Sequence, residues 1–289
     1  MKKNKVYIFV LLALFGWSCA DKEELIPDAP KYEVAFAVSA TPGSLTKASS
    51  IANPQTYATD PIFDEVAYIT LLIYNSKGYL VSELNRWSDM STDVFVSLME
   101  EGTYTAIAIG NNGDEVSGVE RLASAQLNKY YGGQVFLDKT EFKVGPSEKS
   151  EVTLMLKRKV GVLDIDITDQ PTNQSYLVTA TIQNMPITYA LHDFIPAGSR
   201  TLTLGFHPST SSTDFPYYFF LPNNSSSYKT SILLEVYDAT GAINKSFVLK
   251  DVTLGVNMKT TIRGKLYDPQ DHHFTIEVGE DWTEDILDF

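Results

Sequence analysis

Cysteine is almost absent from this chain of 289 residues, in which Cys19 is the only one. A lone cysteine cannot form a disulfide within the chain, so the fold must be stable without one. Basic residues are also scarce, because 23 Lys and Arg stand against 36 Asp and Glu, which gives a net charge of −13. This balance opposes binding to nucleic acid, which requires clustered basic side chains to replace phosphate counterions.

A hydrophobic run long enough to cross a bilayer is missing as well. The apolar stretch Val6 to Trp17 is too short to span a membrane as a helix. It follows the basic segment Met1 to Lys5 and precedes Ser18. A basic start, a short apolar run and a small residue before the cleavage point predict a secretory signal peptide, residues 1–18.

Cys19 stands directly after this signal, and the arrangement resembles the lipobox of bacterial lipoproteins, in which the cysteine is lipidated after cleavage. Trp17 departs from the box, where aliphatic and small residues are commoner. The alternative is an ordinary signal peptide with a cysteine there by chance. With Cys19 carrying palmitate, no thiol remains for disulfides, cysteine catalysis or a metal. The mature chain has a net charge of −16, with 20 basic and 36 acidic residues, so the lipid must provide the membrane attachment.

The residues after Cys19 predict where the lipoprotein goes. Lys22, Glu23 and Glu24 resemble the export signal of Bacteroidetes lipoproteins that are moved to the outer face of the outer membrane. The alternative is a solvated charged tether, since most charge runs are no more than that. Pro27 and Pro30 fit a tether over residues 19–31.

From Tyr32 onward, apolar residues alternate with polar ones in many short segments, which predicts an all-β fold. Because Gly, Asn, Asp, Ser and Pro separate these segments, the pattern favours β-sandwiches over alternating strands and helices. The expected strands include 34–38, 66–74, 94–96, 103–109, 152–156, 163–167, 176–183, 202–206, 232–237, 245–249, 260–267 and 274–278.

One short helix is expected in the first half of the chain. Ser117 to Glu120 forms a capping box, apolar residues from Val119 to Tyr130 follow helical spacing, and Gly132-Gly133 would end the helix.

A weak internal repeat predicts two domains. Leu72 to Gly78 is matched by Glu235 to Gly241: each is a strand that ends in Tyr, then an Asn or Asp, with Gly three residues later. This chemistry suits tight hairpins, although any two hairpins can look alike. Lys157-Arg158-Lys159 lies between two expected strands, so we expect domains at residues 32–158 and 159–289.

Several motifs together resemble the fimbrillin-type lipoproteins of Bacteroidetes, particularly the FimB-like anchor subunits of the Mfa-like group. A Gly-x-Tyr-x-hydrophobic strand ends in Gly-Asn, a later strand ends in Leu-x-Arg, and a late strand follows Asn-Met-Lys. They lie at residues 102–111, 152–160 and 257–262, after the lipoprotein signal and the segment Leu45-Thr46-Lys47-Ala48.

The resemblance implies two tandem transthyretin-like (Ig-like) β-sandwich domains and assembly with other fimbrial subunits by β-strand addition. In polymerising subunits of that family, cleavage after a basic residue removes the first strand. Lys47 lies near that place, although it is Lys rather than Arg and an anchor must keep its lipidated end. The alternative for residues 41–51 is a plain loop.

Groups that could perform catalysis are few, and no cofactor is expected. Ser226 to Lys229 matches Ser-x-x-Lys, but that nucleophile motif opens a helix and here precedes a strand. His272 and His273 are adjacent, so on a strand they would point to opposite faces and chelate a metal poorly. The aromatic run Tyr217 to Phe220 is expected to be core, although exposed rings could stack on sugars.

The sequence thus predicts a non-enzymatic lipoprotein of the outer membrane that acts as a fimbrial anchor or accessory subunit. The alternative is a surface glycan-binding lipoprotein of a polysaccharide-uptake system. A solvent-facing row of Trp87 with tyrosine rings would favour glycan binding, and an open hydrophobic groove beside a terminal strand would favour fimbriae.

Overall fold

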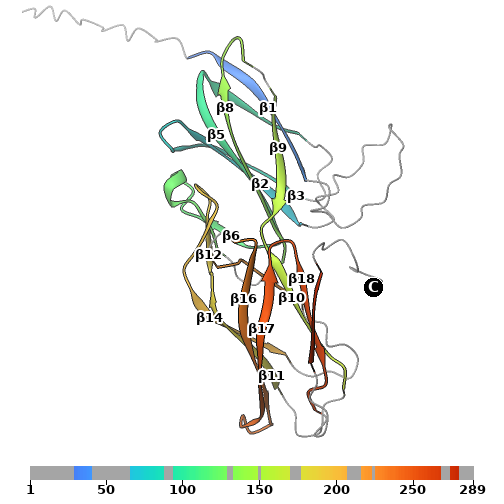
Figure 1. Cartoon of the computed structure of the whole chain (residues 1–289). Helices are drawn as coiled ribbons and strands as arrows, with labels where there is room; N and C mark the ends of the chain where they lie inside the picture. Colours follow the sequence, from blue (N-terminus) through green and yellow to red (C-terminus); the bar gives the residue numbers. More distant parts are fainter. Residues whose placement is uncertain are drawn as a thin grey trace, which may run out of the picture. The chain divides into compact units, whose positions relative to one another are not determined.

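The computed structural model describes residues 29–40, 66–87, 94–128, 133–148, 151–169, 177–206, 216–222, 225–267 and 274–279 (Figure 1). Nearly all of the regular structure in these ranges is β-strand, which confirms the expected all-β class. No helix in the described part of the chain is long and apolar enough to cross a membrane.

The strands fall into an early and a late group along the chain. The early group comprises β1 (Lys31–Ala40), β2 (Tyr68–Asn75), β3 (Leu80–Trp87), β4 (Val94–Glu100), β5 (Gly102–Asn111), β6 (Glu115–Ser117), the 3-10 turn η2 (Leu122–Ser124), β7 (Gln126–Asn128), β8 (Val135–Val144) and β9 (Glu151–Arg158). The late group comprises β10 (Gly161–Ile167), β11 (Leu177–Met185), β12 (Thr188–Ala190), β13 (Ile195–Ala197), β14 (Arg200–Phe206), β15 (Tyr217–Phe219), β16 (Ser227–Tyr237), β17 (Ile243–Gly255), β18 (Lys259–Gly264) and β19 (Phe274–Gly279).

Seven early strands form one sheet in the order β3-β2-β5-β8-β9-β1-β4. Strands β8 and β9 pair at only two positions, Phe136 with Arg158 and Leu137 with Lys157, so the sheet divides there into two layers. Alternating side chains of β1, β4 and β9 pack in one core cluster with those of β2, β5 and β8. The arrangement is a β-sandwich whose interior is filled from both layers.

The late strands form a second sandwich, which likewise has two layers packed around one core. One sheet has the order β15-β10-β18-β19 and the other the order β14-β11-β16-β17. Their inward side chains, among them Ile165, Ile182, Leu234 and Ile262, form a single core cluster. In each sandwich the first strand runs parallel to a late one, β1 beside β9 and β10 beside β18.

A third core cluster contains residues from both groups of strands. Leu72 and Tyr74 of β2 pack there with Val160, Tyr189 and Phe220. The short sheet β13-β12-β7-β6 likewise pairs early strands with late ones. The two sandwiches lie in separate stretches of sequence on either side of residue 159, and we propose that the domain boundary lies there.

Arg158 connects two of the motifs that suggested the family resemblance. Its Nε donates to Gln134 Oε1 at 2.8 Å, and its Nη1 donates to Asn257 Oδ1 at 2.7 Å. The guanidinium also lies over the Phe136 ring, 5.0 Å from the centroid. Since Arg158 is only 3% exposed, these contacts are what makes a buried cation tolerable.

The two repeat hairpins have the same hydrogen-bond pattern, as the sequence predicts. Asn75 Oδ1 accepts from the N–H groups of Lys77 and Tyr79 at 3.0 and 3.1 Å. Asp238 Oδ1 accepts from the N–H groups of Thr240 and Ala242 at 2.8 and 3.0 Å. Gly78 and Gly241 each have the positive φ that such turns need, at 76° and 83°. A hydrogen bond from the Thr240 side chain is the main reason why the pKa of Asp238 is lowered.

The predicted helix at residues 117–133 is wrong for the part of it that the structure describes. Residues up to Asn128 form the strands β6 and β7 around the single 3-10 turn η2. Gly118 has φ +64, which a right-handed helix cannot accommodate. The backbone bonds to the first hairpin instead, since Leu122 N–H donates to Gly78 O and Leu80 N–H donates to Glu120 O.

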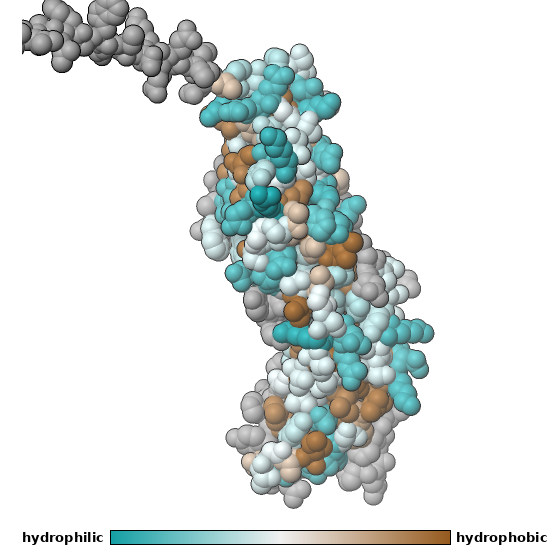
Figure 2. Space-filling model, turned by 90° about the vertical axis from the view of Figure 1, so that its left-hand side faces the viewer, coloured by the Kyte–Doolittle hydropathy of each residue, from teal (hydrophilic) through white to brown (hydrophobic). Residues whose placement is uncertain are grey.

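Hydrophobic side chains on the surface are dispersed. On the face drawn in Figure 2, hydrophobic residues occur in small patches separated by hydrophilic ones. Those with large exposed fractions lie mainly on strands and include Val81, Trp87, Val94, Val96, Leu98, Met155, Ile243 and Val248.

Candidate strand-addition site

Most of the residues singled out as sites lie outside the described ranges. These are Cys19, Lys22, Glu23, Glu24, Lys47, His272 and His273. Strand β1, which precedes Lys47 in the sequence, lies within the described residues. Its contacts show which interactions an added strand would have to replace.

Strand β1 is hydrogen-bonded on both sides. It pairs antiparallel with β4, from Lys31 opposite Glu100 to Ala37 opposite Val94. It pairs parallel with β9, from Ala35 opposite Glu151 to Ala40 opposite Leu156. Its backbone therefore occupies an interior position in its layer, between two strands that come later in the sequence.

The side chains of β1 fill the first core at alternate positions. Val34, Phe36 and Val38 are 1%, 0% and 3% exposed. The Phe36 ring meets the Phe142 ring edge to face, with centroids 5.4 Å apart. Burial of each such side chain is worth about 1.5–3 kcal/mol, so β1 contributes strongly to the stability of this sandwich.

Loss of β1 would open a groove of defined chemistry. The facing edges of β4 and β9 would lose their hydrogen-bond partners, and three apolar holes would be left at two-residue spacing. An extended peptide with apolar residues at alternate positions could satisfy both needs at once. Lys47 follows β1 in the sequence, so cleavage there would break the covalent link between β1 and the rest of the chain.

The two outermost strands of the seven-stranded sheet, β3 and β4, flank a hollow of about 260 Å³. Val81 and Ser82 of β3 and Ser97 to Glu100 of β4 line it. Nearby, Val94, Val96 and Leu98 of β4 are 44%, 50% and 66% exposed. Among the described strands, none pairs with the outer edge of β3 or β4, and an apolar edge of this kind is a template for pairing.

Tyr104 also lines this hollow. Its hydroxyl donates to the backbone oxygen of Glu100 at 2.9 Å. Burial, with a smaller effect of the Glu100 carboxylate, raises the pKa of the Tyr104 phenol. The phenol therefore stays protonated and keeps donating this hydrogen bond at neutral pH.

Strand β19 is the edge of the second sandwich. It pairs with β18 from Lys259 opposite Gly279 to Gly264 opposite Phe274. Ile276 and Val278 are 38% and 37% exposed, and the Phe274 ring packs against the Phe247 ring at 5.8 Å. An edge strand that carries exposed apolar residues could pair with another chain.

The aromatic residues favour a core role over a binding platform. Phe219 and Phe220 are buried, in the second and third core clusters respectively, which confirms the expectation for that run. Trp87 is 54% exposed, and its ring lies 5.2 Å from the Tyr68 ring at a tilt of 45°. Within the described ranges this is a single pair and not a row of rings. Burial is the main reason why the Tyr68 pKa is raised.

The Ser-x-x-Lys motif lacks the context that its chemistry requires. Ser227, Tyr228 and Lys229 begin the strand β16, and Ser226 precedes it, so no helix opens at this serine. Among the described residues, no group of three His, Cys, Asp or Glu side chains is placed to hold a metal ion.

Solved structures with the same fold come from Bacteroides species. A candidate polysaccharide-binding protein of Bacteroides thetaiotaomicron matches with a TM-score of 0.54 and 11% identity, over 86% of this chain and 97% of that protein. Two candidate adhesins of Bacteroides ovatus match with TM-scores of 0.54 and 0.52. Their identities are 12% and 10%, over 86% and 77% of this chain and 94% and 84% of theirs.

At these identities the likeness shows the fold alone, which extends over most of the chain. No protein-family model and no curated protein sequence matches it. These three proteins are described as a candidate polysaccharide-binding protein and two candidate adhesins.

Proposed function

We propose that this chain is a non-enzymatic accessory or anchor subunit of a surface fimbria. It is held in the outer membrane by lipid on Cys19 and joined to other fimbrial subunits by β-strand addition. The observation that carries the proposal is the outer edge of β4, with which no described strand pairs and along which Val94, Val96 and Leu98 are exposed. The shared fold with candidate adhesins supports the same assignment.

The anchor role rests on the order of the N-terminal features. Cys19 and the charged residues Lys22, Glu23 and Glu24 precede β1, so an uncut chain keeps the lipid attached to the strand that completes the first sandwich. Such a subunit has no need to exchange β1. It can instead accept or donate a strand at another edge, and the apolar edges of β4 and β19 are suited to this.

The processing state of Lys47 separates an anchor from a polymerising subunit. We expect an anchor isolated from cells to begin at Cys19 and to carry acyl chains. Intact-mass measurement of the cell-bound protein gives the N-terminus directly. A cell-bound chain that begins at Ala48 would show that β1 is released, and it would contradict the anchor role.

The fimbrial role is tested by deleting the gene and measuring fimbrial protein in the cell-bound and culture-supernatant fractions. We expect fimbriae that are shed, loosely attached or abnormal in length, because the base is no longer held by lipid. Complementation with the wild-type gene should restore attachment, and complementation with the Cys19→Ala variant should not. Unchanged attachment and length, together with lost growth on one polysaccharide, would replace this proposal with the glycan-uptake alternative.

A further inference from the structure

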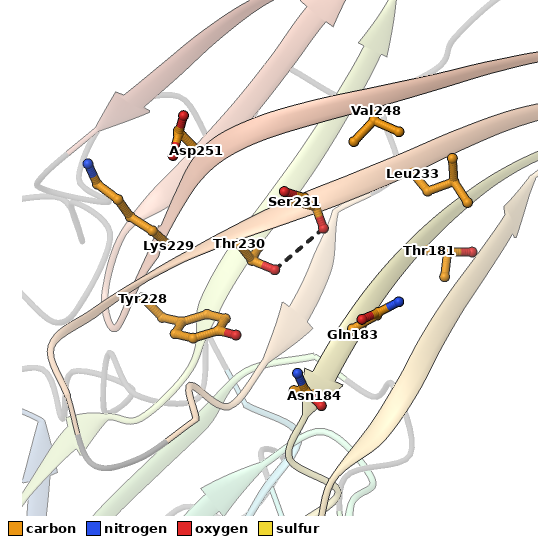
Figure 3. Close-up of a pocket in the computed structure, with 10 residues that line it drawn as sticks. All are labelled: Thr181, Gln183, Asn184, Tyr228, Lys229, Thr230, Ser231, Leu233, Val248 and Asp251. Atoms are coloured by element: carbon orange, nitrogen blue, oxygen red, sulfur yellow. Dashed lines mark hydrogen bonds between the residues drawn. The ribbon is translucent and has the colours of Figure 1, made fainter.

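The second sandwich carries a hollow of about 540 Å³ on the outer face of the sheet that contains β11, β16 and β17 (Figure 3). This volume lies within the roughly 300–1,000 Å³ that small-molecule sites usually have. Its lining residues come from three adjacent strands and are Thr181, Gln183, Asn184, Tyr228, Lys229, Thr230, Ser231, Leu233, Val248 and Asp251.

Two β-bulges shape this hollow. On β11, Gln183 and Asn184 together stand opposite the single residue Thr201 of β14, where the register shifts between Ile182 and Met185. On β17, Lys250 and Asp251 together stand opposite Ser231 of β16. Bulges bend a strand and re-aim its side chains, and they are frequent next to functional sites.

Each bulge contains a residue in the left-handed region. Asn184 has φ 59° and Asp251 has φ 58°, and only four non-glycine residues of the described chain have a positive φ. Both side chains line the hollow. Such backbone conformations cost energy and persist where the surrounding structure or a function requires them. The presence of two such residues at one concave surface indicates a preformed binding site.

The polar side chains in the hollow are not used by the fold. Among the described residues, the side chains of Gln183, Asn184, Tyr228, Lys229 and Asp251 have no hydrogen-bond or ion-pair partner. The bonds made by lining side chains are peripheral: Thr230 Oγ1 donates to Ser231 O at 3.4 Å, and the hydroxyls of Thr181 and Thr203 lie 3.3 Å apart. Two amides, a phenol, an ammonium and a carboxylate therefore remain available to a ligand.

Apolar groups form the other part of the surface. Thr181 of β11 stands opposite Leu233 of β16, which stands opposite Val248 of β17, so the three make one cross-strand row. Val248 is 57% exposed. Figure 3 shows Tyr228 on the side of Gln183 and Asn184, with Lys229 and Asp251 at the other end of the hollow. The surface thus combines an apolar area, against which C–H groups of a ligand could pack, with hydrogen-bond donors and acceptors at its margins.

This combination fits a sugar ring better than the other ligand classes. A neutral sugar has hydroxyls that both donate and accept, which match amides and a carboxylate, and C–H faces that pack on Leu233 and Val248. A polyanion would meet one lysine beside one aspartate in an acidic chain. An added β-strand would pair at the outer edge of β17 and not within this hollow, since β11 and β16 are already paired on both sides.

We propose that this hollow is a binding site for a neutral sugar unit of a glycan chain. The site is independent of the proposed fimbrial role, since it lies on a face of the sheet that contains β11, β16 and β17 and not at the edges of β4 and β19 suggested for assembly. Gln183, Asn184 and Asp251 would bind hydroxyls, and Leu233 and Val248 would pack against the C–H face of the sugar.

The test is binding of the purified full-length chain, in detergent, to an array of neutral and acidic oligosaccharides, followed by calorimetric titration with the neutral glycan bound best. Gln183→Ala and Asp251→Asn should each weaken binding at least tenfold. Asn at position 251 tolerates the same positive φ, so the bulge should persist. Lys250→Ala is the matched control: this exposed neighbour does not line the hollow, and binding should be unchanged.

Thermal unfolding of each variant shows whether the sandwich is intact, and only variants that melt with the wild type are compared. The absence of binding to every neutral glycan on the array would overturn the proposal. Binding that survives both pocket variants but is lost in Trp87→Ala would also overturn it, because the sugar would then lie at the Tyr68–Trp87 pair. Fimbrial attachment in cells should be the same for wild type and pocket variants, so failure here leaves the fimbrial proposal standing.

Discussion

At the scale of single residues, a close approach between two backbone segments depends on Gly161 in β10. A Cβ built on Gly161 would lie 2.0 Å from the backbone oxygen of Gly255 and 2.8 Å from the Phe219 ring. A backbone oxygen cannot move aside as a flexible side chain can, so β10 and β17 approach only because no side chain stands at this position. The site lies next to Val160, whose backbone oxygen accepts a hydrogen bond from the N–H of Asn257 at 2.9 Å.

The substitution Gly161→Ala should lower the free energy of unfolding by about 1–3 kcal/mol, the usual cost of overpacking a core. Gly205→Ala is the control, because its Cβ would meet only Leu177 Cδ1 at an ordinary 3.5 Å. Urea unfolding followed by tryptophan fluorescence measures both variants. Equal stability of the two would show that the close approach at Gly161 is not required.

Cys19 carries the other prediction at this scale. Cys19→Ala should abolish acylation and release the protein from membranes, because an acidic chain is not attracted to anionic lipid and the proposed lipid would provide the attachment. Incorporation of radiolabelled palmitate and the amount of protein in the membrane fraction measure the effect. Continued labelling, or unchanged retention in membranes, would reject the lipoprotein assignment.

At the scale of elements, the segment between Ser117 and Asn128 shows how tertiary contacts override a local pattern. Its capping box and apolar spacing favour a helix, yet the backbone donors and acceptors bond to the hairpin of β2 and β3 instead. Arg121 lies over the Tyr79 ring, 4.5 Å from its centroid, and is bridged to the same residue. The segment thus serves as a cover for the turn at Gly78.

The substitution Gly118→Ala tests whether this segment forms the helix that the sequence predicts or the strands that the structure shows. In a helix, Ala in place of Gly would add about 1 kcal/mol of stability. In the observed structure Gly118 has φ +64, and a Cβ would meet the backbone oxygen of Ser124 at 2.4 Å, so stability should fall. Gly241→Ala is the control, because its φ is +83 and its Cβ would meet nothing within 4 Å. We expect chemical denaturation to show a larger loss of stability for Gly118→Ala than for Gly241→Ala. A gain in stability for Gly118→Ala would favour the helix over the observed strands.

At the scale of the whole molecule, the described strands form two sandwich cores, with a third core cluster that draws on both halves of the sequence. The first strand of each sandwich is enclosed by partners from later in the chain. Neither β1 nor β10 can therefore reach its final place until the following strands are present. In an uncut chain β1 is thus held in place by hydrogen bonds on both sides and by its three buried side chains.

We expect the charged residues after Cys19 to act as an export signal for the whole molecule. Replacing Lys22, Glu23 and Glu24 together with Ala should leave lipidation intact but keep the protein on the inner leaflet of the outer membrane. Protease treatment of whole cells measures exposure, with Lys31→Ala as a control for loss of a charge near the tether. Equal digestion of the triple variant and the wild type would show that these charges form only a tether.

The sequence alone determined the class of the fold, most of the long strands and the chemistry of both hairpin turns, because these follow from two-residue periodicity and from local side-chain bonds to the backbone. It did not predict β3 or β8, whose polar residues mask the alternation, nor the short strands of the sheet that joins early and late elements. Partners, register and bulges could be decided only by the tertiary structure. Position in the sequence says nothing about which strand lies beside β1, and the hollow around Gln183 and Asp251 exists only because two bulges bend three paired strands together.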